Sequence, residues 1–120
     1  GTKFIQTQFC YDIDILKNYM KHIVDAGLTD KLAFIIGIGP FKTGKTAQWM
    51  KEKLFGTIIP DAMIRRMDQA NDKLEEGIII CAELIDQLQD IDGVSGAHLM
   101  APRNLSGIAA SVKRAGITIS

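Results

Sequence analysis

The sequence predicts an α/β fold in which parallel strands alternate with helices. Three runs have the length and composition of strands, at residues 3–9, 32–38 and 96–100. Between and after them, apolar residues recur every three to four positions, the spacing that gives a helix one buried stripe. Such alternation implies right-handed crossovers. We therefore expect three adjacent parallel strands in chain order, with helices on one face of the sheet.

The first strand is marked by an alternating pattern. Its sequence, KFIQTQF, places Phe4, Gln6 and Gln8 on one face and Thr7 on the other, toward the helices. An acidic residue just after the strand can cap the helix that follows. The apolar positions of that helix form one stripe: Ile13, Leu16, Met20, Ile23 and Val24.

The second strand, LAFIIGI, is almost continuously apolar, which is typical of a strand covered on both faces. A glycine-rich turn over residues 39–44 follows, and then a helix over about residues 46–54. A further helical stretch opens at Pro60, and a longer one covers residues 71–89 with an apolar face that includes Cys81.

The last unit is a short strand at residues 96–100 (GAHLM) and a helix at residues 105–115 that Gly116 closes. In parallel α/β folds, active residues lie where strands end and helices begin. We therefore expect them at residues 8–12, 39–46 and 100–104.

The composition is that of one globular domain. The chain has 120 residues, of which 47% are hydrophobic and 23% charged. Lys plus Arg and Asp plus Glu each number 14. A protein that binds a phosphate backbone usually has a basic excess, so we expect no nucleic-acid partner.

Cysteine use and hydropathy limit the cellular setting. Cys10 and Cys81 are far apart and show no metal-ligand spacing, so we expect no metal site and a reducing, cytoplasmic location. No apolar run approaches the ~20 residues of a membrane span, so no membrane partner is expected. The chain lacks an initiator Met and enters a strand almost at once, which suggests a piece of a longer protein.

Residues 39–46 (GPFKTGKT) match the phosphate-loop pattern GxxxxGK[ST], between a strand and a helix. In a nucleotide-binding protein, Lys45 would reach the phosphates and Thr46 would bind magnesium. Pro40 lacks the amide hydrogen that such a loop needs, and no strand ending in Asp follows to complete the magnesium site. The other interpretation is a βα turn whose glycines relieve crowding and whose Lys42 and Lys45 face solvent.

Five segments carry a family resemblance. They are residues 4–12 (FIQTQFCYD), 34–40 (FIIGIGP), 59–61 (IPD), 94–100 (VSGAHLM) and 112–117 (VKRAGI). In order and spacing they resemble the methylenetetrahydrofolate reductase family, which has a "TQFFFD"-like strand end, an "IIPGI-P" turn and, in one branch, a "GVxGxHxM" strand. The resemblance extends over nearly the whole chain.

The resemblance implies a flavin-dependent oxidoreductase on a TIM (β/α)8 barrel. The family binds FAD and reduces 5,10-methylenetetrahydrofolate to 5-methyltetrahydrofolate, with NADH or NADPH as a possible electron donor. A complete barrel takes about 250 residues, so residues 1–120 would be its C-terminal segment of about three βα units. The implied partners are the folate substrate, the N-terminal remainder of the barrel and further copies in a homo-oligomer. The family's catalytic acid lies in earlier strands, so we expect no catalytic residue in this segment.

The resemblance also assigns residues to the site. Gln8 matches the family glutamine whose amide hydrogen-bonds the folate pterin, and an amide offers the donor and acceptor that a pterin edge requires. The alternative for Gln8 is a bond to a neighbouring backbone group. Gln6, on the same face of the strand, is expected to contact the cofactor.

The turn after the second strand departs from the family pattern. Gly44 stands where some members have a phenylalanine that covers folate or nicotinamide, which leaves the electron donor open. Phe41 is expected to substitute for that ring, and Lys42 to meet the glutamate tail of the folate. Asn104 is expected to contact the substrate, and His98 to be structural.

Two alternatives from other classes stay open. The first is a nucleotide-binding protein that uses residues 39–46, for which magnesium-dependent binding would be lost in Lys45→Ala. The second is a non-catalytic half-barrel that binds a partner through its uncovered strand edges. Concentration-dependent association without ligand binding would favour the second.

Overall fold

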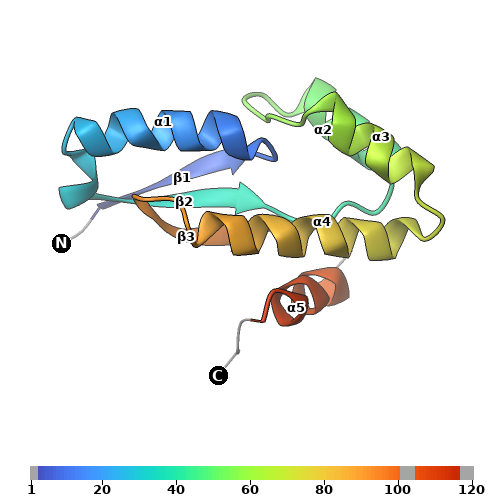
Figure 1. The fold of residues 1–120 in the computed structure, drawn as a ribbon. Coiled ribbons are helices and arrows are strands. Elements are labelled where there is room, and N and C mark those ends of the chain that lie inside the picture. Colours follow the sequence, from blue (N-terminus) through green and yellow to red (C-terminus); the bar gives the residue numbers. More distant parts are fainter. Residues whose placement is uncertain (1–2, 101–104, 117–120) are drawn as a thin grey trace.

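The computed structural model describes residues 3–100 and 105–116. Three parallel strands form one sheet in the order β1-β2-β3, which confirms the strand prediction (Figure 1). The strands are β1 (Lys3–Phe9), β2 (Leu32–Ile38) and β3 (Val94–Leu99). The helices are α1 (Ile13–Asp25), η1 (Leu28–Asp30, a 3-10 turn), α2 (Gly44–Lys53), α3 (Asp61–Gln69), α4 (Lys73–Leu88) and α5 (Leu105–Arg114).

Side-chain caps determine where three of these helices begin. Asp12, Thr43 and Asp72 each accept a hydrogen bond from the backbone N–H three residues ahead. Helix α2 therefore begins at Gly44, two residues before the predicted start. The Asp72 cap likewise shortens α4 relative to the predicted range of 71–89.

One face of the sheet carries α1 and α4, which lie beside each other across it (Figure 1). Phe34, Ile36 and Ile38 of β2 are at most 1% exposed and form the centre of the core. Burial of such side chains is the main favourable term in folding. Strand β3 begins at Val94, earlier than the predicted residue 96, because Val94 pairs with Phe34 across the sheet.

The opposite face of the sheet has no described helix over it (Figure 1). The ring of Phe4 is 63% exposed, Gln6 is exposed, and Ile35 is only half-buried. Within the described residues, β1 and β3 also pair with another strand along one edge only. Unpaired edges and exposed apolar faces favour association with further chain.

Three aromatic rings close the core at the C-terminal ends of the strands. Tyr11 stacks on Phe9 with ring centroids 6.1 Å apart and lies 4.3 Å from the ring of Phe41. Its hydroxyl donates a 2.8 Å hydrogen bond to the carbonyl oxygen of Gly39. Burial raises the pKa of Tyr11 far above its usual value. The cluster joins the end of β1 to the turn after β2.

Both cysteines are buried and unpaired thiols. Burial raises the pKa of the Cys10 thiol, and it raises the pKa of Cys81 to about 11. Since the thiolate is the reactive form, neither residue has the surroundings of a nucleophile.

We predict that Cys10 and Cys81 react slowly with a thiol reagent at pH 8 and rapidly after denaturation. The same pKa shifts make stability depend on pH. An unfolded thiol ionises near pH 8.5, so the contribution of the neutral buried thiols is complete below that pH and declines as pH rises toward 11. Fast labelling of the folded protein at pH 8 would contradict the burial of these thiols.

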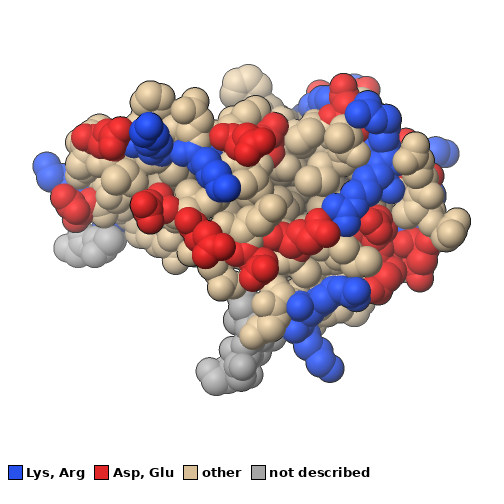
Figure 2. Space-filling view, viewed as in Figure 1, with Lys and Arg blue, Asp and Glu red and all other residues tan. Residues whose placement is uncertain are grey.

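Figure 2 shows the charged side chains on one face of the molecule. On the face drawn in Figure 2, acidic and basic side chains are interspersed over the helices. This agrees with the balanced composition. No helix within residues 3–100 and 105–116 is long and apolar enough to cross a membrane.

Candidate functional site

The end of β1 is irregular at the residues predicted to face a ligand. The pairing of β1 with β2 shifts register between Gln6 and Phe9. Within this bulge, the Thr7 hydroxyl donates to the carbonyl oxygen of Gln8 and accepts from the N–H of Gly37. A Cβ on Gly37 would lie 3.0 Å from the Thr7 carbonyl oxygen, so a glycine permits this close approach. The Thr7 side chain therefore forms a hydrogen bond with the backbone of β2. The sequence predicted only that Thr7 faces the helices.

Gln8 is exposed at the C-terminal end of β1, with one end of its amide held in place. Its Oε1 accepts a 3.1 Å hydrogen bond from the N–H of Phe9. Among the residues that the structure describes, the Nε2 group of Gln8 has no hydrogen-bond partner. The backbone-bond interpretation of Gln8 therefore holds for its oxygen, and the bond to a pterin stays a prediction for its donor.

The connection between α2 and α3 packs against Gln8 and forms hydrogen bonds with the residues that follow it. Ile58 donates to the carbonyl oxygen of Phe9 at 3.0 Å, and its own carbonyl accepts from the N–H of Tyr11 at 2.8 Å. Gly56 has a φ of +84° and packs against the side chain of Gln8. A Cβ built on Gly56 would lie 3.7 Å from the Cβ of Gln8. Figure 1 shows this connection reaching back to the end of β1.

A hollow of about 250 Å³ lies beside this support. Gln8, Gly56 and Ile58 line it together with Ile15 and Tyr19 of α1, which are 49% and 46% exposed. Sequence reasoning did not find this part of the site. The only signal was the run Gly56-Thr57-Ile58-Ile59-Pro60, in which β-branched residues between a glycine and a proline are compatible with a short extended segment.

The glycine-rich turn after β2 is packed against protein on two sides. A Cβ on Gly39 would lie 1.9 Å from the carbonyl oxygen of Met100, and one on Gly44 would lie 1.8 Å from Oδ1 of Asp68. The Asp68 carboxylate therefore lies against the first turn of α2, where helix amides favour an anion. A phosphate held at this turn would be repelled by that carboxylate. Lys45 is exposed, so the arrangement favours a crowded βα turn over a phosphate loop.

Phe41 lies in the core rather than on a surface. Its ring is 1% exposed and packs on Tyr11, and its backbone contacts Gly77 of α4. The expectation that this ring covers a ligand is not met by the geometry, because no face of it is open. The turn directs the side chain inward, where burial of a phenyl group stabilises the fold.

Lys42 lies at the rim of an open basin of about 810 Å³. The basin lies between the turn after β2, the turn before α4 and the beginning of α5, where Ser106 lines it. The second lysine of the basin, Lys73, is engaged: its Nζ donates to the carbonyl oxygens of Met67, Asp68 and Ala70 at the end of α3. Lys42 is the cation of this basin that could meet an acidic ligand.

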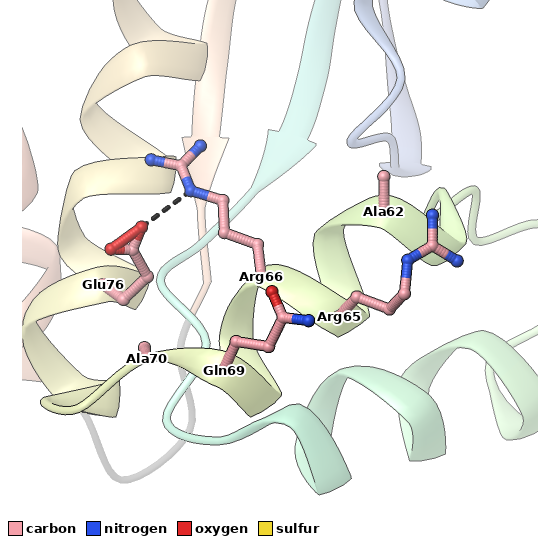
Figure 3. A pocket seen from close by; sticks show the side chains of 6 residues that line it. All are labelled: Ala62, Arg65, Arg66, Gln69, Ala70 and Glu76. Atoms are coloured by element: carbon pink, nitrogen blue, oxygen red, sulfur yellow. Dashed lines mark hydrogen bonds and ion pairs between the residues drawn. The ribbon is translucent and has the colours of Figure 1, made fainter.

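A second hollow, of about 380 Å³, lies between α3 and α4 (Figure 3). Arg66 crosses it and donates to Glu76 at 2.7 Å, and its two terminal nitrogens donate to Glu83 at 2.7 and 3.0 Å. The bonds with Glu83 and Glu76 raise the pKa of Arg66 above its usual value, and Arg66 lowers the pKa of Glu83. Because both carboxylates already neutralise Arg66, this hollow joins two helices and is a poor anion site.

The sequence matches the family described as methylenetetrahydrofolate reductase over residues 1–116. The chain belongs to this family. Among curated proteins, none gives a significant match. The methylenetetrahydrofolate reductase family is an FAD-dependent oxidoreductase family on a TIM barrel, so the three parallel βα units are a segment of such a barrel.

The uncovered face of the sheet carries an exposed amide, that of Gln6, and an exposed ring, that of Phe4. The interior of a closed TIM barrel is a packed core, and sites lie at the C-terminal ends of its strands. Phe4, near the start of β1, is therefore suited to barrel packing, and the contact of Gln6 with the cofactor stays a prediction.

His98 was expected to be structural and Asn104 to contact the substrate. His98 of β3 is exposed and pairs with Gly37 across the sheet. No group of His, Cys, Asp and Glu within residues 3–100 and 105–116 could hold a metal ion. Asn104 lies outside the described residues.

Proposed function

We propose that this chain is the C-terminal segment of a methylenetetrahydrofolate reductase barrel and supplies the folate side of its pocket. The reaction is reduction of 5,10-methylenetetrahydrofolate to 5-methyltetrahydrofolate. The family match and the parallel β1-β2-β3 order support a barrel segment. Since a closed barrel needs about 200 residues or more, a further part of the barrel must complete the sheet.

The observation that carries the proposal is the geometry of Gln8. Its Oε1 is held by the Phe9 N–H, so the amide cannot rotate freely, and its Nε2 donor is free within the described residues. A fixed amide at the C-terminal end of a barrel strand can donate to a pterin ring nitrogen or carbonyl, and its oxygen has a second lone pair to accept from a pterin N–H.

The other residues of the segment bind and orient rather than react. When bound, the reduced form of the FAD cofactor would supply the hydride for the methylene carbon. Gln6 contacts that cofactor, and Lys42 pairs with the carboxylates of the glutamate tail at the basin of about 810 Å³. Asn104 contributes a substrate contact. Proton donation belongs to the part of the barrel outside this segment.

Other residues bear on the electron donor and on the cellular setting. NADH or NADPH is the possible electron donor, and position 44 cannot provide an aromatic cover for its nicotinamide while Asp68 lies against it. Two buried, unpaired thiols suit a reducing compartment, so we place the protein in the cytoplasm. The uncovered strand edges favour a homo-oligomer or a partner chain.

Replacing Gln8 by alanine in the complete barrel should weaken binding of methyltetrahydrofolate by about 1–3 kcal/mol, since the polar group of the ligand that Gln8 binds is left unpaired. Isothermal titration of the folate measures this. Gln69→Ala, which removes an exposed amide on α3, is the matched control and should bind as the unmodified protein does. Equal folate affinity of Gln8→Ala and the unmodified protein would refute the role of Gln8.

A further inference from the structure

The free edge of β1 is closed by the chain itself at one end only. The N–H of Ile58 donates to the carbonyl oxygen of Phe9, and its own carbonyl oxygen accepts from the N–H of Tyr11. Between these two residues, Cys10 donates its N–H to β2. Backbone groups alternate in direction along a strand, so Ile58 forms its parallel bridge with Cys10 on the edge away from β2. Within the described residues, this edge has no partner strand over residues 3–8.

The helix-covered face of the sheet also lacks cover on this side. Ile5 and Phe34 are paired across β1 and β2, yet Phe34 is 1% exposed and Ile5 is 40% exposed. Ile15 and Tyr19, one turn apart on α1, are half exposed and line the hollow of about 250 Å³ together with Ile58. Apolar surface therefore continues from the open edge of β1 onto one flank of α1.

We propose that this side of the segment docks a βα unit. Its strand runs parallel to β1 along residues 3–8, and its amphipathic helix fills the hollow beside α1. The inference rests on the proposed function, in which a further part of the barrel completes the sheet. All strands of a TIM barrel are parallel, and a right-handed crossover into β1 places its helix on the face that carries α1. That helix covers Ile5 and packs on the exposed flank of α1.

The bridge from Ile58 limits how far the incoming strand can pair. Since Ile58 occupies the edge at Cys10, the added strand pairs with β1 no further than Gln8. A second copy of this chain is the other possible occupant. Two β1 edges related by a two-fold axis run antiparallel, whereas the described pairings of β1 are parallel. The parallel pairing favours the βα unit.

Thiol labelling of the complete barrel and of residues 1–120, at one low protein concentration, tests the docked helix. Tyr19→Cys places a thiol on the exposed flank of α1, and mass spectrometry follows the peptide that carries it. This thiol should react rapidly in residues 1–120 and lose most of its reactivity in the complete barrel, because the packed helix removes its exposure. Lys21→Cys, on another side of the same helix, is the matched control and should react equally fast in both. Fast labelling of Tyr19→Cys in the complete barrel would overturn the inference.

Hydrogen exchange of the unmodified protein tests the added strand without a substitution. The open-edge amides of residues 4–8 should exchange more slowly in the complete barrel than in residues 1–120. The amide of Tyr11, which already bonds Ile58, should be protected in both. Unchanged exchange over residues 4–8 would overturn the added strand. Protection in residues 1–120 that rises with concentration, and that is no greater in the complete barrel, would assign the face to a second copy and overturn the inference.

The outcomes separate this inference from the proposed function. Fast labelling at position 19 together with weak folate binding by Gln8→Ala would overturn the docking and leave the proposed function standing. Slow labelling at position 19 in a complete barrel that binds no methyltetrahydrofolate would support the docking and overturn the folate role.

Discussion

Replacing Gly77 by alanine should lower the free energy of unfolding by about 3 kcal/mol or more, because the new methyl group has no space. Its Cβ would lie 1.9 Å from the carbonyl oxygen of Phe41 and 2.9 Å from the carbonyl carbon. Both atoms belong to the backbone, so no side-chain rotation can relieve the overlap. Helix α4 must therefore separate from the turn after β2, which opens the core around Phe41.

Chemical denaturation followed by circular dichroism measures this effect. All variants should be compared at one protein concentration, since self-association makes apparent stability depend on concentration. Gly96→Ala is the control: a Cβ on Gly96 meets nothing within 4 Å, so its stability should change by less than about 1 kcal/mol. Equal stability of Gly77→Ala and Gly96→Ala would show that α4 does not pack on this turn as described.

Truncating Phe41 to alanine should cost about 3–5 kcal/mol, the range for a fully buried aromatic side chain. The ring is 1% exposed and lies 4.3 Å from that of Tyr11. Its loss leaves a cavity between the end of β1 and the turn after β2.

The matched control for Phe41 is a phenylalanine that packs on nothing in the described fold. Phe55→Ala removes the same ring from a position that is 98% exposed, and it should change stability by less than about 0.5 kcal/mol. The same denaturation experiment compares the two. A Phe41→Ala variant that is fully stable but binds folate poorly would restore Phe41 as a ligand contact and contradict its place in the core.

The sequence predicts the strands and their order well because each strand is a short run with its own pattern. Residues 32–38 are almost wholly apolar, and β2 is the central strand with Phe34, Ile36 and Ile38 in the core. The helix starts are less well predicted, since a cap is chosen by hydrogen-bond geometry. Thr43 and Thr46 are both possible caps in the sequence, and only the fold shows that Thr43 caps α2.

The candidate site is only partly visible in the sequence. Gln8 can be selected from its position at a strand end, but its support by Gly56 joins residues 48 positions apart and leaves no periodic signal. The direction of Phe41 and the contact between Gly44 and Asp68 are also tertiary effects. For Phe41 and Gly44 the local sequence correctly predicts a turn, and contacts with residues far away in the chain decide which side chains stay exposed.

The central claim is that this chain carries one side of a folate pocket and needs further barrel strands to hold the flavin. The most direct measurement is the solution mass of residues 1–120 over a range of concentrations, with parallel titrations of FAD and methyltetrahydrofolate. The uncovered sheet face and the strand edges predict concentration-dependent association and no tight FAD binding. A stable monomer that binds FAD stoichiometrically would contradict the claim.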